Sequence, residues 1–139
     1  VELGKLLNNF HAHSKTTALV CHGPIALLST LSNPTAFTRQ LETGTQATTS
    51  GWTYAGYKFT VISNQEEELA KGLLKGGVMK FYPQTALEQA GGVYSSNSSP
   101  WTSHVVIDRE LVTGQNPGSA LDVGKVILDR LKSQSQAKD

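Results

Sequence analysis

The stretch TALVCHGPIALL, residues 17–28, holds the only cysteine of the chain between two apolar segments. Residues 16–20 form a short apolar run that ends in a glycine-containing turn, which predicts a buried strand. The run over residues 24–31 begins with a proline and predicts a helix. Cys21 would therefore lie between a buried strand and a helix, where open α/β sheets bind their ligands. This strand–cysteine–helix order is typical of a nucleophile elbow.

The residues around Cys21 suit a reactive thiol. The N-terminal end of a helix favours an anion and lowers the pKa of a thiol placed there. Gly23 allows the tight turn to pack, and the backbone N–H of His22 is placed to donate one hydrogen bond of an oxyanion hole. The alternative is that Cys21 is a small buried apolar residue, as most free cysteines are. The stretch alone leaves both interpretations open.

The composition is that of one globular domain covering residues 1–139. Of these residues, 38% are hydrophobic and 17% are charged, with a formal net charge of +1. The 12 basic and 11 acidic residues are interspersed, which argues against a nucleic-acid-binding face. No apolar run approaches the ~20 residues that span a membrane. A single cysteine excludes a multi-cysteine metal site, and His11 and His13 would face different sides of a helix, so no metal or other cofactor is expected.

The apolar pattern alternates between helical and extended segments, which predicts an α/β fold. Ser63 and Glu66 have the spacing of a capping box, so a helix should begin there. Residues 32–53 are rich in Thr, Gly and Pro and are expected to run over the surface. The polar residues 133–139 are expected to form a disordered tail. Helices are expected at 1–13, 24–31, 63–75, 83–91 and after 118, and strands at 16–20, 57–62 and in two pieces within 104–114.

The predicted strands are few for a central parallel sheet. The strand before Cys21 is already the first of the chain, whereas an open α/β sheet normally has several strands before such a point. A helical period is also running at the third residue, with Leu3, Leu6 and Leu7 at helical spacing. We therefore expect the chain to be the C-terminal portion of a larger domain, with the N-terminal strands missing.

Three separate stretches resemble motifs of the ThiJ/PfpI family, within the class I glutamine-amidotransferase-like superfamily. They are VCHGPIALL at 20–28, FTVISNQEE at 59–67 and LVTGQNPGSA at 111–120. The resemblance implies a flavodoxin-like three-layer sandwich with a mostly parallel central sheet. Histidine directly after the cysteine, together with TGQNP, is similar to the branch that contains heat-shock chaperones and cofactor-independent glyoxalase III enzymes.

The resemblance also implies roles for particular residues. Cys21 would be the nucleophile, His22 the base, and Glu67 the carboxylate that orients the imidazole. This grouping is chemically coherent, because a thiolate adds to a carbonyl while the histidine moves protons. Glu66 fits the capping box better, although Asn64 with Glu67 could cap equally well, so the choice between the two glutamates stays open.

A loop motif follows the last predicted strand. Gln115, Asn116 and Pro117 are expected to organise a loop beside the pocket, with Asn116 capping the final helix. The family also places a glutamate and a Gly-Gly-His-Gly stretch, which supplies a second oxyanion donor, before the nucleophile strand. Neither is found in these residues.

The function implied by the resemblance is a cofactor-independent cysteine enzyme that converts methylglyoxal or glyoxal to a 2-hydroxy acid. The alternatives are a PfpI-type peptidase or amidase, and a holdase chaperone or redox-stress protein without turnover. The expected partners are a small carbonyl or amide substrate, and either a second copy of the chain or the missing N-terminal segment. The cytoplasm is favoured, with the periplasm as the alternative.

Overall fold

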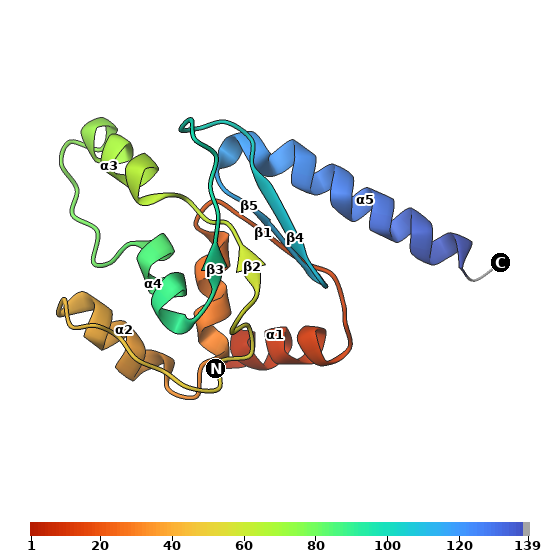
Figure 1. Ribbon diagram of the computed structural model, residues 1–139, viewed down its shortest axis with the longest axis horizontal. Helices are drawn as coiled ribbons and strands as arrows, with labels where there is room; N and C mark the ends of the chain where they lie inside the picture. Colours follow the sequence, from red (N-terminus) through yellow and green to blue (C-terminus); the bar gives the residue numbers. More distant parts are fainter. Residues whose placement is uncertain (138–139) are drawn as a thin grey trace.

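Two parallel strands hold the cysteine turn in place. β1 (Thr17–Val20) pairs with β5 (Leu111–Gly114), so that Val20 lies opposite Gly114. β4 (Val105–Asp108) pairs with the other side of β5 in the antiparallel direction, which gives the order β1–β5–β4 (Figure 1). β5 is central and buried at every position. Within the described part of the chain, β1 pairs with β5 alone.

The structure is a computed structural model, and it describes residues 1–137. A second, two-stranded parallel sheet lies beside β4, and helices alternate with the strands along the chain, so the predicted α/β class is confirmed. The further elements are α1 (Glu2–Ala12), the 3₁₀ helix η1 (Gly23–Thr30), α2 (Pro34–Glu42), β2 (Lys58–Phe59), α3 (Asn64–Leu73), α4 (Pro83–Ala90), β3 (Val93–Tyr94), the 3₁₀ turn η2 (Pro117–Ser119) and α5 (Ala120–Gln136).

The core behind the cysteine turn is rich in aromatic rings. Tyr54 is fully buried, and its ring centroid lies 5.3 Å from that of Tyr57 and 6.0 Å from that of Trp52, both in edge-on geometry. The polar tips of these rings are satisfied, because the Tyr54 hydroxyl donates to the carbonyl of Leu7 and Trp52 Nε1 donates to that of Leu27. Buried aromatic residues that also find a hydrogen-bond partner fix their neighbours in orientation. Here they hold α1 and η1 against one another.

Helix α1 and η1 touch through their backbones. A Cβ built on Gly4 would lie 2.1 Å from the carbonyl oxygen of Ser29, so a side chain at this position would force the two elements apart. Since η1 begins directly after Cys21 and His22, this close approach also fixes the element that follows the cysteine turn.

The segment 32–53, which its composition predicts to run over the surface, also contains a helix. It contains α2, which begins with Pro34 and is capped by Asn33, whose side chain accepts a hydrogen bond from Ala36 N–H at 3.0 Å. Phe37 and Trp52 are only 2% and 5% exposed. The Asn-Pro start and the four-residue spacing of Phe37 and Leu41 are helix signals, but the threonines and glycines around them mask the period.

Three other expectations are corrected by the structure. The predicted disordered tail is wrong for residues 133–136, because α5 continues to Gln136; residues 138 and 139 lie outside the described part. The helix expected at 24–31 is a 3₁₀ helix that starts one residue earlier, and the strand expected at 57–62 is reduced to the two residues of β2.

Candidate active site

Cys21 lies directly after β1 in a backbone conformation that is uncommon for a residue with a side chain. Its φ is +61°, in the left-handed region. Its N–H donates to the carbonyl of Gly114 at 2.8 Å, so the parallel pairing reaches the cysteine before the chain turns into η1. Such conformations persist where surrounding structure holds them, and they concentrate at functional sites. The predicted strand–cysteine–helix turn is thus present, with the strain on Cys21 itself.

Gly23 contributes less to the turn than its position suggested. It does not adopt a positive φ, and an added Cβ would meet Leu19 at 3.5 Å, an ordinary contact distance. The conformational freedom of glycine is therefore not what forms this turn.

His22 connects the cysteine to a distant carboxylate. Its Nδ1 lies 3.4 Å from Cys21 Sγ, and its Nε2 lies 2.5 Å from Glu67 Oε1. A carboxylate accepts hydrogen bonds, so Nε2 carries the proton and Nδ1 is left with a free lone pair toward the sulfur. The imidazole is half exposed at 53%, whereas the Glu67 side chain is 4% exposed. Cys21, His22 and Glu67 are thus linked by consecutive hydrogen bonds, which end at the buried carboxylate of Glu67.

The start of α3 determines which glutamate reaches His22. Ser63 caps the helix, and its hydroxyl accepts from Glu66 N–H while Glu66 accepts from Ser63 N–H, which confirms the predicted capping box. Glu67, one residue further, faces His22. Asn64 caps nothing here, since its backbone N–H and side-chain amide donate to Gln84 and Thr85 on α4. Geometry therefore places Glu66 in the cap and Glu67 against the imidazole.

Two residues of the loop motif after β5 donate hydrogen bonds to Glu66. Gln115 and Asn116 are 1% and 0% exposed, and their side-chain amides donate to the Glu66 carboxylate at 3.0 and 2.8 Å. The side chain of Asn116 does not cap a helix, contrary to expectation, because its amide oxygen accepts from the Ser119 hydroxyl and not from a backbone N–H. Its amide nitrogen donates to Glu66 and to the carbonyl of Thr102. Pro117 starts η2 and is exposed. The hydrogen bonds from this motif to Glu66 were not predictable from the sequence, because the motif and the glutamate are about 50 residues apart.

No family model matches the chain, but related proteins are found both by sequence and by structure. The chain is 31% identical over 119 residues to a Bos taurus protein named glutamine amidotransferase-like class 1 domain-containing protein 1, with 86% of this chain and 46% of that protein covered. It is 27% identical over 129 residues to glyoxalase 3 of Candida albicans, with 91% and 48% covered. The X-ray structure of Rapid Encystment Protein 24 kDa from Francisella tularensis superimposes with a TM-score of 0.68 at 30% identity, covering 90% of this chain and 47% of that one. The predicted resemblance to the ThiJ/PfpI family is confirmed by these relatives.

The fold of the chain is flavodoxin-like, as predicted. The crystal structure of glyoxalase III from Candida albicans, at 22% identity, superimposes with a TM-score of 0.62 over 91% of the chain. The chain spans about half the length of the curated relatives that it matches. Among the described residues, no helix combines the length and the apolar content needed to cross a bilayer.

The electrostatics of the site oppose the low pKa that a helix N-terminus would give a cysteine. Burial raises the pKa of the Cys21 thiol above its ordinary value, a backbone hydrogen bond from His22 lowers it, and the negative charges of Glu66 and Glu67 raise it further. The expectation of a lowered thiol pKa is therefore wrong in direction. Desolvation and nearby like charge both disfavour the thiolate. At neutral pH Cys21 is a thiol, and it needs a base to become a nucleophile.

Alkylation of Cys21 should accordingly follow an alkaline pH profile. We expect the rate of reaction with iodoacetamide, followed by intact mass, to rise with an apparent pKa above the ordinary thiol value of about 8.5. The urea-unfolded protein is the control and should titrate at that ordinary value. Fast labelling of the folded protein with an apparent pKa below about 7 would show that the charges and burial described above do not govern this thiol.

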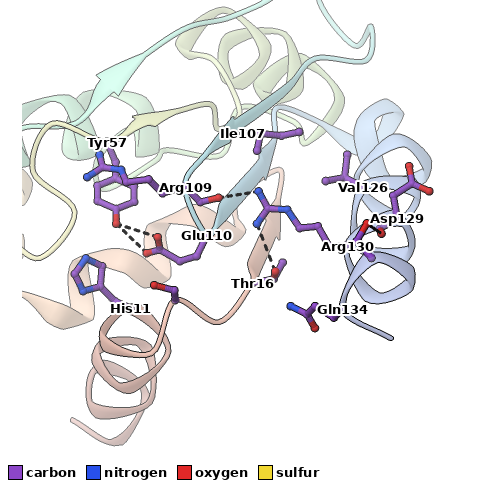
Figure 2. A pocket seen from close by; sticks show the side chains of 12 residues that line it. His11, Thr16, Tyr57, Ile107, Arg109, Glu110, Val126, Asp129, Arg130 and Gln134 are labelled. Carbon is purple, nitrogen blue, oxygen red and sulfur yellow. Dashed lines mark hydrogen bonds between the residues drawn. The ribbon is translucent and has the colours of Figure 1, made fainter. Parts of the chain in front are cut away.

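A cavity of about 840 Å³ lies at the other end of β1 from Cys21. Figure 2 shows it between the end of α1, the β4–β5 turn and the C-terminal half of α5. At its wall, the Tyr57 hydroxyl donates to the Glu110 carboxylate, and Arg130 donates to Thr16 Oγ1 and to the carbonyl of Arg109. Cys21, His22 and Glu67 are not part of this lining. Within the described residues no group of three His, Cys, Asp or Glu side chains is placed to hold a metal, and His11 belongs to this cavity instead.

Proposed function

We propose that Cys21, His22 and Glu67 form the catalytic group of a cofactor-independent enzyme that acts on small reactive carbonyls such as methylglyoxal and glyoxal. The observation that carries the proposal is the continuous chain from Cys21 Sγ to His22 Nδ1, at 3.4 Å, and from His22 Nε2 to Glu67 Oε1, at 2.5 Å. A thiol that is protonated at rest, next to an imidazole with a free Nδ1, is suited to transfer its proton as it attacks. The name of the Candida albicans relative, glyoxalase 3, supports this substrate class.

The reaction balances without an oxidant. The sulfur of Cys21 bonds to the aldehyde carbon, and the thiol proton passes through His22 Nδ1 to the carbonyl oxygen, which gives a hemithioacetal. His22 then removes the proton from that carbon while the neighbouring carbonyl oxygen gains a proton, which gives an enediol. A proton returns to the neighbouring carbon, which becomes the hydroxyl-bearing carbon, and the first hydroxyl loses its proton as the first carbon becomes the thioester carbonyl. Water cleaves the thioester, releases the 2-hydroxy acid and restores the thiol. Throughout, Glu67 stabilises the charged imidazole and holds its tautomer.

The oxygen that becomes negative needs a donor. The N–H of His22 follows directly after the cysteine and lowers the pKa of the thiol, so we expect it to lie beside the position of an attacked carbonyl. A backbone donor of this kind, aimed at the developing charge, is worth roughly 10²–10³-fold in rate. We propose the cytoplasm as the compartment, because its reducing conditions keep a lone thiol nucleophile in the reduced form.

The test is product formation from ¹³C-labelled methylglyoxal, followed by NMR with the purified protein and with its Cys21→Ser variant. We expect lactate from the unsubstituted protein and a loss of at least ~10³-fold in the variant, because serine keeps the shape but is a far weaker nucleophile. No lactate from either protein, or equal amounts from both, would refute the proposal. A stable acyl adduct on Cys21 with amide or ester probes would favour the peptidase or amidase alternative. Suppression of client aggregation that survives in Cys21→Ser, without lactate, would favour the chaperone.

A further inference from the structure

Glu66 is a fully buried carboxylate that binds five donors. Its Oε1 accepts from the N–H of Trp101 and from the side-chain amide of Asn116, both at 2.8 Å. Its Oε2 accepts from Ser63 N–H at 3.0 Å, from the Ser63 hydroxyl at 3.2 Å and from the Gln115 amide at 3.0 Å. The side chain is 0% exposed and takes part in no ion pair within the described chain.

These donors keep Glu66 charged in the interior. Burial by itself would raise its pKa, but the hydrogen bonds from Ser63, Trp101, Gln115 and Asn116 outweigh burial and hold the pKa below its ordinary value. A carboxylate that accepts several well-placed N–H bonds is stabilised in its ionised form. Neutral dipoles alone therefore compensate this charge, and every one of them must stay in place.

The donors come from three separate segments that meet at this one side chain. Ser63 opens α3, Trp101 lies in the loop between β3 and β4 with a strained φ of +64°, and Gln115 and Asn116 follow β5. Gln115 also accepts from Asn97 N–H at 2.8 Å, which ties a second point of the same loop to the turn. Glu66 is the common anchor of these segments.

We propose that Glu66 is the positioning residue of the Cys21–His22–Glu67 site, and that the Gln115–Asn116 motif serves to bind it. Glu66 and Glu67 are consecutive in the first turn of α3, and the hydrogen bonds of Glu66 fix how that turn is rotated. Rotation of the turn would carry Glu67 Oε1 away from His22 Nε2, now 2.5 Å away. Glu66 does not touch His22 or Cys21, and it acts on them through Glu67 and through its buried charge, which bears on the thiol.

The run Glu66-Glu67-Glu68 supplies its own controls, since the same change can be made at three consecutive positions. Glu68 is largely exposed and bonds Lys71 and Tyr82, away from the site. The first readout is the far-downfield proton NMR signal of His22 Nε2–H, which a short hydrogen bond to a carboxylate produces. The second is the pH profile of Cys21 alkylation. Both are recorded below the melting temperature of each variant, and neither requires turnover.

We expect Glu66→Gln to abolish or shift the His22 signal as Glu67→Gln does, and to move the Cys21 alkylation profile to lower pH, because a negative charge is removed. Glu68→Gln should leave both readouts unchanged. If Glu66→Gln melts earlier but keeps the His22 signal and the alkylation profile of the unsubstituted protein, Glu66 is a structural anchor only and the proposal is overturned. Should that variant fail to fold, Asn116→Ala removes one donor from Glu66 Oε1 and is judged by the His22 signal, which should shift, because the charge of Glu66 is retained.

A third readout, the rate of lactate formation, rests on the proposed function. In this assay, Glu66→Gln should lower kcat by about 10²-fold with little change in KM, as a small misplacement of a catalytic group does. If the protein forms no lactate but the His22 signal responds to Glu66→Gln and not to Glu68→Gln, the proposed reaction fails while the positioning role stands. If lactate forms at the unsubstituted rate in Glu66→Gln, the positioning role fails and the reaction stands.

Discussion

Replacing Glu67 with glutamine should lower turnover by roughly 10²–10⁴-fold while the protein remains folded. The carboxylate of Glu67 accepts the Nε2 proton of His22, which leaves Nδ1 free to take the thiol proton. A glutamine amide can turn its NH₂ toward Nε2, and the imidazole proton then moves to Nδ1, where it faces the sulfur and cannot act as a base. The measurement is kcat/KM for lactate formation, with circular dichroism to verify the fold.

In the same variant, the acidity of the Cys21 thiol and the rate of turnover should change in opposite directions. Because the charge on Glu67 raises the pKa of Cys21, its removal should make the thiol more acidic while turnover falls. The matched control is Glu68→Gln, one residue further on α3, which should retain full turnover. Turnover of Glu67→Gln within twofold of the unsubstituted protein would mean that His22 does not depend on this carboxylate.

Replacing Phe59 with alanine should lower the free energy of unfolding by about 3–5 kcal/mol. The ring is 2% exposed and lies 5.6 Å from that of Tyr94. It is also enclosed by backbone, since a Cβ built on Gly92 would come within 2.5 Å of it. Backbone on one side and a second ring on the other prevent the space from collapsing, so the variant would leave a cavity. Urea denaturation with constant m-value is the measurement.

Leu73→Ala, at the exposed end of α3, provides the comparison for Phe59→Ala. Leu73 is 82% exposed, and its truncation should change stability by no more than about 0.5 kcal/mol. A loss below about 1.5 kcal/mol for Phe59→Ala would show that β2 and β3 can close over the missing ring. Phe59 also bears on the candidate site. Residues 60–63 lead from Phe59 into α3, and the N–H of Thr60 donates to Thr113 Oγ1 on β5.

Local signals in the sequence predict the elements that build the site. Pro83 begins α4, and Gly91 ends it with a φ of +109°, a conformation that glycine adopts at low cost. Ser63 and Glu66 show the start of α3 through their spacing. The motif around Cys21 places the cysteine turn correctly after β1. In each case a few neighbouring residues carry the information.

Features that depend on distant partners were not predictable in this way. The donors of Glu66 are 35 to 50 residues away from it, apart from Ser63, and no spacing rule connects them. The pKa shift of Cys21 was predicted in the wrong direction for the same reason. It depends on burial and on the charges of Glu66 and Glu67, which tertiary packing brings near the thiol. The composition of residues 32–53 also hid α2, whose buried face becomes evident only against the core.

The φ of +61° at Cys21 limits which residues can replace the cysteine without distorting the turn. Serine, asparagine and glycine tolerate the left-handed region, whereas a β-branched side chain there is a genuine outlier. An exchange of cysteine for serine therefore keeps the turn, but threonine, the other hydroxyl nucleophile, would require the turn to be rebuilt. The backbone geometry of the turn therefore restricts substitution at the nucleophile position independently of side-chain chemistry, and Cys21→Thr should be less stable than Cys21→Ser.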